Sequence, residues 1–108
     1  LKQILRNLLN YIDLISGEYL MIEKEVVVKN RAGIHARPAA SIVKTANQFS
    51  CELRFKNDND ELNAKSIMGI ITLAAGYKTK LTILAECDDE VEAAEAVYQL
   101  FESKFEED

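Results

Sequence analysis

The sequence predicts an α+β domain, an open-faced sandwich in which four strands form one sheet and three helices cover a single face of it. The first observation is the order of periodic segments, which is strand, helix, strand, strand, helix, strand, helix. The second is that each predicted strand has one mainly apolar face, so the helices need to cover only that face. A chain of 108 residues is the length of one domain.

The first strand is expected over residues 22–29, where Val26 and Val28 share a face with Ile22. Residues 30–33 form a loop in which Gly33 allows an unusual φ. The first helix is expected over residues 36–48. Its apolar stripe consists of Ala39, Ile42, Val43 and Ala46.

A hairpin follows, with strands over residues 51–56 and 61–65 and an Asn/Asp-rich turn between them. Ser66 then opens a short, mostly apolar helix over residues 67–75, which Gly76 can end in the left-handed conformation.

The fourth strand is expected over residues 79–87, with Leu81, Ile83 and Ala85 on one face and Leu84 on the other. Asp88 or Asp89 caps the last helix, since Asp89 and Glu92 have capping-box spacing. The predicted buried stripe of that helix consists of Val91, Ala94, Val97, Tyr98, Phe101 and Phe105.

Residues 1–20 resemble an amphipathic helix that Ser16 and Gly17 would end. They are too polar for a membrane span and lack a signal-peptide cleavage site. A membrane-surface or partner-binding helix is one interpretation. We favour another, in which this stretch is a start-site artefact and the native protein begins at Met21.

The net charge of −5 argues against a nucleic-acid-binding protein, which needs a basic face. No apolar run approaches the roughly 20 residues of a membrane span, so no stable membrane insertion is expected. Basic residues nevertheless gather near two motifs, which indicates either a positive docking patch or an ordinary mixed surface. They are Lys29, Arg31, Arg37, Lys44 and Lys65.

Two cysteines without CxxC spacing, together with one histidine, do not predict a metal site. Without a secretory signal pattern, reduced thiols and a cytoplasmic location are expected.

The most informative stretch, residues 33–40, contains the only histidine, His35, and the only proline, Pro38. Proline suits the first turn of a helix, so His35 lies at the helix start and Arg37 in the first turn. Free amides and the helix dipole make a helix start a good phosphate site. These features together predict a histidine that carries a phosphoryl group.

The stretch Gly-Ile-His-Ala-Arg-Pro-Ala-Ala over residues 33–40 resembles the active site of HPr, the histidine-containing phosphocarrier family of the bacterial phosphoenolpyruvate:sugar phosphotransferase system. The stretch Asn-Ala-Lys-Ser-Ile-Met-Gly over residues 63–69 resembles that family's regulatory serine region. The resemblance extends from about Met21 to the C-terminus.

The resemblance implies an antiparallel sheet in the order 1-4-2-3. That order places Cys51 and Cys87 at the same end of neighbouring strands, and we expect them to be close together but reduced, with a redox switch as the alternative. It also implies that His35 accepts a phosphoryl group on Nδ1 from enzyme I and passes it to enzyme IIA components. Arg37 would orient and stabilise that group.

Ser66 has a sufficient structural explanation as a helix cap. The resemblance adds a regulatory one, in which HPr kinase/phosphorylase phosphorylates Ser66, lowers transfer through His35 and recruits a transcriptional partner. Ile67 and Met68 would then form an exposed contact patch, and Lys44 a docking charge.

Two departures bear on function. Ala32 occupies a loop position where some family members have a polar side chain that could assist the phosphohistidine. The run Ala-Ala-Gly-Tyr over residues 74–77 replaces a more glycine-rich one in the family, so a different choice of partner is expected.

The leading hypothesis is thus a sugar phosphocarrier, expected to be a monomer without a cofactor. The alternative is a regulatory or adaptor protein of an incomplete or nitrogen-type phosphotransferase branch. A self-sufficient enzyme is disfavoured because one histidine leaves no general base to assign.

Overall fold

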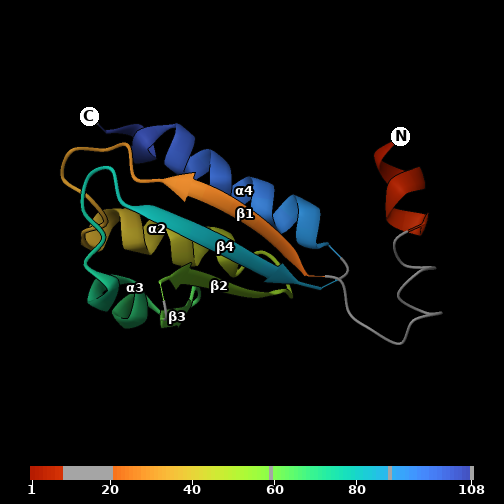
Figure 1. Ribbon diagram of the computed structural model, residues 1–108, viewed down its shortest axis with the longest axis horizontal. Coiled ribbons are helices and arrows are strands. Elements are labelled where there is room, and N and C mark those ends of the chain that lie inside the picture. Colours follow the sequence, from red (N-terminus) through yellow and green to blue (C-terminus); the bar gives the residue numbers. More distant parts are fainter. Residues whose placement is uncertain (9–20, 59, 88, 108) are drawn as a thin grey trace.

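The sheet and its helices form in the predicted order. A computed structural model describes residues 1–8, 21–58, 60–87 and 89–107. Its elements are β1 (Ile22–Val27), α2 (Ala36–Ala46), β2 (Glu52–Asn57), β3 (Asp60–Asn63), α3 (Ile67–Leu73), β4 (Lys80–Glu86), α4 (Glu90–Glu102) and the 3₁₀ turn η1 (Lys104–Glu106) (Figure 1).

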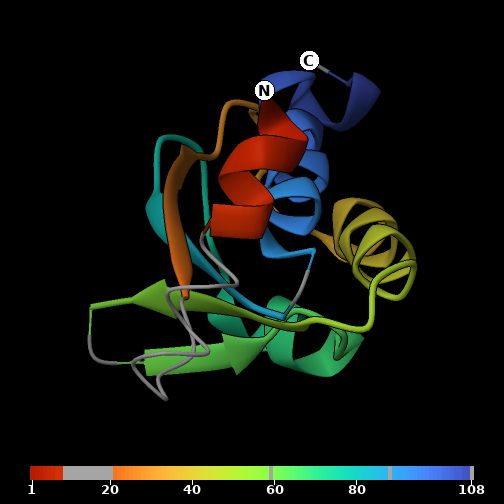
Figure 2. The same cartoon turned by 90° about the vertical axis from the view of Figure 1, so that its right-hand side faces the viewer.

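The four strands form one antiparallel sheet in the order β1-β4-β2-β3, which confirms the expected open-faced sandwich. β4 lies in the centre, where Ile83 is opposite Lys24 of β1 and Phe55 of β2. Helices α2, α3 and α4 lie on the same side of this sheet, as Figure 2 shows. The β1–α2 loop, the α3–β4 connection and η1 consequently meet at one end of the molecule (Figure 1).

The core lies between the sheet and the helices. Phe55 of β2 packs edge-on against Phe101 of α4 with ring centroids 5.8 Å apart, and Phe101 packs in the same way against Phe105 of η1 at 5.0 Å. Such edge-to-face contacts add to the burial of the rings themselves. The phenylalanines therefore attach the C-terminal turn to the sheet.

Two predicted details of the helices are wrong, and a third is confirmed only in position. α3 ends at Leu73, and Ala74 rather than Gly76 takes the left-handed conformation, with a φ of 51°. Val91 of α4 is exposed, whereas Ala93 is buried in its place. Asp89 is the N-cap residue of α4, as predicted, but its side chain makes no capping hydrogen bond. Asp88, the other candidate, lies outside the described residues.

Leu84 lies on the sheet face that the helices leave open, yet only 2% of it is exposed. Its cross-strand neighbours are Glu23 of β1 and Arg54 of β2. Arg54 forms ion pairs with Glu61 at 3.2 Å and with Glu86 at 3.8 Å. The methylene groups of long charged side chains can cover an apolar neighbour in this way while their ends stay paired.

Cys51 and Cys87 are close together, as expected, but the expectation that they are reduced is wrong. The structure joins them by a disulfide, with Cα atoms 4.7 Å apart. They lie where β2 begins and β4 ends, and this separation is within the range that a disulfide spans. The bond therefore closes one end of the sheet.

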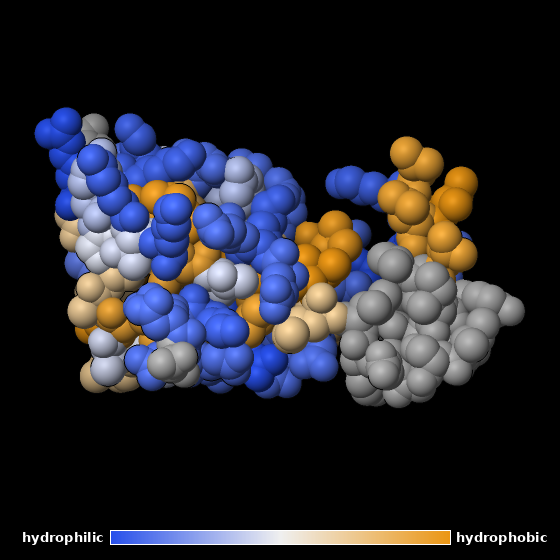
Figure 3. Space-filling view, viewed as in Figure 1, coloured by the Kyte–Doolittle hydropathy of each residue, from blue (hydrophilic) through white to orange (hydrophobic). Residues whose placement is uncertain are grey.

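The N-terminal segment is helical over residues 2–8, and the rest of the amphipathic helix predicted for residues 1–20 lies outside the described residues. Arg6 forms an ion pair with the buried Glu90 at 2.6 Å, which joins this segment to the start of α4. Figure 3 shows hydrophobic side chains gathered on the segment. Among the residues described, no helix has the length and hydropathy needed to cross a membrane.

Candidate active site

The site begins at the N-terminus of α2, where His35 is the N-cap residue. Its backbone is extended (φ −90°, ψ −170°), and its carbonyl accepts a hydrogen bond from the Ala39 amide at 3.0 Å. The imidazole makes no capping bond to the helix and is 43% exposed. The ring is therefore held at the helix start and remains accessible from solvent.

Gly33 fixes the loop that leads to the histidine. Its φ of +74° is in the left-handed region, and a Cβ at this position would lie 2.8 Å from the Ala75 carbonyl oxygen. The next amide, that of Ile34, donates to the same oxygen at 2.9 Å. Only glycine allows both this φ and this close approach, so Gly33 sets the distance between the His35 loop and the α3–β4 connection.

Asn30 is fully buried beneath this loop. Its Nδ2 donates to the Gly33 carbonyl at 2.7 Å and to Oε1 of Glu107 at 2.8 Å. One amide group thus joins the His35 loop to the C-terminal end of the chain. Its Oδ1 has no hydrogen-bond partner among the described residues.

Glu107 reaches the histidine itself, with Oε1 at 3.0 Å from Nε2 of His35. The hydrogen bond from Asn30, the contact with His35 and the positive charge of Arg37 all lower the pKa of the Glu107 carboxyl, and the Asn30 bond has the largest effect. An ionised carboxylate only accepts hydrogen bonds, so in the neutral ring Nε2 carries the proton. Nδ1 is then the nitrogen with the free lone pair.

The C-terminal turn explains how Glu107 reaches this position. Lys104, Phe105 and Glu106 all have positive φ values, between 55° and 60°. Left-handed conformations are costly outside glycine, and burial of the Phe105 ring against Phe101 offsets that cost. The turn bends the chain back, so that Glu107 lies over the start of α2.

Arg37 is exposed in the first turn of α2 and acts on Glu107 through its charge. The amides of Ala36 and Arg37 belong to the first turn, where no helix carbonyl is available to accept from them. An anion on His35 would therefore find backbone donors and a guanidinium nearby. Lys44, in contrast, lies in the last turn of the helix.

The second predicted site is the start of α3. The Ser66 hydroxyl accepts a hydrogen bond from the Gly69 amide at 3.1 Å, so the predicted cap is confirmed. Met68 is 70% exposed and Ile67 42%, whereas Ile70 is buried. The short helix therefore exposes Ile67 and Met68, together with Ile71 at 37%, and begins at a half-buried Ser66.

The structure thus brings His35 and Arg37 together at one helix start and places Ser66, Ile67 and Met68 at another. Sequence reasoning missed Asn30 and Glu107. Nothing in the sequence distinguishes Asn30 from an ordinary loop residue. Glu107 is 72 positions from His35 and belongs to the acidic run over residues 106–108, which carries no signal of a site.

The sequence is similar to those of known proteins. The family model described as "PTS HPr component phosphorylation site" matches residues 22–103. The phosphocarrier protein HPr of Treponema pallidum is 48% identical over 88 residues, which cover 82% of this chain and all of that protein. The HPr-like protein Crh of Halalkalibacterium halodurans is 44% identical over 84 residues, covering 78% of this chain and all of the relative.

A solved structure supports the same assignment. The crystal structure of HPr from Thermoanaerobacter tengcongensis superposes with a TM-score of 0.77 at 46% identity, and the match covers 81% of this chain and 98% of that one. The sequence, the fold and the position of His35 at a helix start all support the same family. The chain belongs to the HPr family of phosphocarrier proteins of the phosphotransferase system.

Proposed function

We propose that His35 is the phosphoryl acceptor and that Nδ1 is the reacting nitrogen. The observation that carries this proposal is the contact between Nε2 and the ionised Glu107, which leaves the Nδ1 lone pair free. That lone pair forms a bond to phosphorus while the bond between phosphorus and its donor breaks. Enzyme I is the donor and enzyme IIA components are the acceptors.

Charge stabilisation is the larger part of catalysis in such a transfer. Arg37 donates to the oxygens of the phosphoryl group, and the first amides of α2 do the same. Phosphorylation of Nδ1 leaves the proton on Nε2, so the ring becomes positively charged. Glu107 then stabilises that charge and holds the ring in one orientation, which makes it a positioning residue.

Labelling with phosphoenolpyruvate and a bacterial enzyme I tests this proposal. Wild-type protein should acquire acid-labile phosphate, His35→Ala should acquire none, and Ser66→Ala should behave like wild type. Label that survives acid, or label retained in His35→Ala, would place the acceptor elsewhere.

Regulation at Ser66 is the second part of the proposal. HPr kinase/phosphorylase would add a phosphoryl group to the Ser66 hydroxyl, next to the exposed Ile67 and Met68. A phosphate at a helix N-terminus is favourable, so this modification changes the surface charge without unfolding α3. Lys44 contributes a docking charge on α2. A transcriptional regulator would then recognise the modified face.

A second candidate function is a regulatory or adaptor role in an incomplete or nitrogen-type phosphotransferase branch. The similarity to the HPr-like protein Crh favours it. Incubation with ATP and HPr kinase distinguishes the two functions. Acid-stable label on Ser66, without any transfer from enzymes I of two different sources, would support the regulatory role.

The proposal also covers the domain boundary, the cellular location and the oligomeric state of the protein. The carrier domain comprises residues 21–108 and acts as a cytoplasmic monomer, and residues 1–20 form an extension outside it. The family match begins at residue 22, which is consistent with this boundary. A chain lacking residues 1–20 should keep its circular dichroism spectrum and its phosphoryl transfer; loss of the folded spectrum would contradict the boundary.

A further inference from the structure

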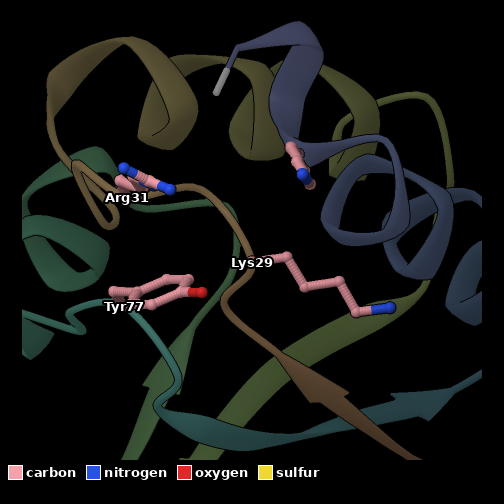
Figure 4. Close-up of a pocket in the computed structure, with 4 residues that line it drawn as sticks. Lys29, Arg31 and Tyr77 are labelled. Carbon is pink, nitrogen blue, oxygen red and sulfur yellow. The ribbon is translucent and has the colours of Figure 1, made fainter.

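A pocket of about 410 Å³ lies at the end of the molecule where three segments meet (Figure 4). Lys29 and Arg31 come from the chain between β1 and α2, Tyr77 from the α3–β4 connection and Lys104 from η1. His35 and Arg37 do not line it. The pocket is therefore a feature separate from the histidine site.

The pocket is strongly basic within a protein of net charge −5. Lys29 forms an ion pair with Glu102 of α4. Arg31 and Lys104 also line the pocket, and neither side chain forms a hydrogen bond or ion pair with another residue that the structure describes. Like charges that the fold brings together repel one another, and an anion between them would relieve the repulsion.

Tyr77 supplies a different kind of surface. It is half exposed, and Figure 4 shows Arg31 beside its ring, with the hydroxyl directed towards the side of the pocket on which Lys29 lies. The hydroxyl can donate to a phosphate oxygen, and the ring can stack on a planar group. Lys78 adds a cation 5.3 Å from the ring centroid.

We propose that this pocket binds a small phosphorylated anion, either a diphosphate or a phosphate ester. Arg31 binds two phosphate oxygens with its planar guanidinium, and Lys104 and Tyr77 donate to others. The volume is within the range of small-molecule sites. The polar lining favours a charged ligand over an apolar one.

The pocket and the histidine site are neighbours, because the Glu107 amide donates to the Lys104 carbonyl at 3.0 Å and Glu107 contacts His35. An anion at the start of α2 could be mistaken for one in the pocket. The test must therefore separate Arg31 and Lys104 from His35 and Arg37. The inference itself does not depend on phosphoryl transfer by His35.

Calorimetric titration of the full chain at constant ionic strength provides the test, with pyrophosphate and ADP as probes. Both should bind the wild-type protein. Arg31→Gln and Lys104→Gln should each raise the Kd about tenfold, because each removes one charged donor. If the wild-type protein binds ADP more tightly than pyrophosphate, and Tyr77→Leu removes that difference, a planar ring stacks on Tyr77. If the two probes bind equally, the pocket recognises phosphate alone.

Lys56→Gln is the matched control, since Lys56 is an exposed lysine on β2, outside the pocket. It should leave the Kd unchanged, and so should His35→Ala. Arg31 and Lys104 are both exposed, so their variants should keep the wild-type Tm. Absence of binding up to about 10 mM, an equal loss in Lys56→Gln, or loss only in His35→Ala would each overturn the proposal.

Discussion

Nε2 of His35 and Oε1 of Glu107 lie 3.0 Å apart although 72 positions separate the two residues in the chain. Asn30 holds the same carboxylate oxygen from below at 2.8 Å. The contact assigns the ring proton to Nε2, because the carboxylate can only accept a hydrogen bond. Under the proposed function, this contact leaves Nδ1 as the nitrogen that faces an incoming phosphoryl group.

Replacement of Glu107 by glutamine should slow phosphoryl transfer to His35 by about tenfold, which corresponds to a loss of about 1.4 kcal/mol of transition-state stabilisation. The amide removes the negative charge that stabilises the phosphorylated ring. Initial rates with enzyme I would measure this. Glu106→Gln is the control, because Glu106 is the exposed neighbouring carboxylate and should be close to wild type.

The ring proton offers a readout that a loss of stability would not change. In nitrogen-15 NMR spectra of the wild-type protein, the neutral His35 ring should be protonated on Nε2. In Glu107→Gln the two tautomers should mix. A wild-type ring protonated mainly on Nδ1 would contradict the proposed role of Glu107.

The Glu107 contact should also make stability depend on pH in acid solution. The pKa of its carboxyl is lowered in the folded protein, chiefly by Asn30. A carboxyl of this kind stabilises the fold above its ordinary pKa of about 4.3, and the contribution is lost as the pH falls through the lowered value. The difference in Tm between a protein that has the Glu107 carboxyl and one that lacks it should accordingly disappear at low pH.

That comparison is made between His35→Ala and the double variant His35→Ala, Glu107→Gln, so that titration of the imidazole does not contribute. The protein that retains Glu107 should be the more stable at pH 7, and the two should converge below about pH 4. A difference that persists unchanged at about pH 3 would show that the charge of the carboxylate is not its source.

Gly33→Ala should destabilise the protein by about 2 kcal/mol, because alanine must take a left-handed φ and its Cβ would meet the Ala75 carbonyl oxygen. In a domain of this size the expected fall in Tm is roughly 10 °C. Gly76→Ala is the control: a Cβ there has no neighbour within 4 Å, and Tm should hardly change. Similar effects of the two substitutions would contradict this account of the loop.

Ser66 allows its capping role and its proposed regulatory role to be separated. Ser66→Ala removes the acceptor for the Gly69 amide and should cost about 1 kcal/mol in unfolding free energy. Ser66→Asp keeps a capping oxygen and adds charge, so it should retain stability while transfer through His35 slows. If Ser66→Asp transfers as fast as wild type, a negative charge at this position is not sufficient for regulation.

The sequence predicted the fold well because local pattern and topology agree: alternation defined the strands, and helical stripes defined the helices. Predictions failed where the conformation or burial of one residue depends on its contacts in the folded protein. Ala74 rather than Gly76 ends α3, and Ala93 rather than Val91 is buried in α4. Neither the disulfide between Cys51 and Cys87 nor the buried position of Asn30 follows from spacing along the chain.

In the candidate site, too, the residues with a local sequence signal could be predicted and those placed by tertiary contacts could not. His35, Arg37 and Ser66 are next to helix starts, and helix starts have local signals such as proline and a capping serine. Glu107 has no such signal. Its position depends on the burial of Phe105, which the apolar stripe predicts, and on three successive left-handed residues, which no local signal predicts.

The most direct test of the central claim is to identify the phosphorylated atom after incubation with phosphoenolpyruvate and enzyme I. Phosphorus-31 and nitrogen-15 NMR spectra should show one phosphoryl group bonded to Nδ1 of His35, and His35→Ala should show no phosphohistidine. A phosphoryl group on Nε2, or none on His35 with enzymes I from two sources, would contradict the account.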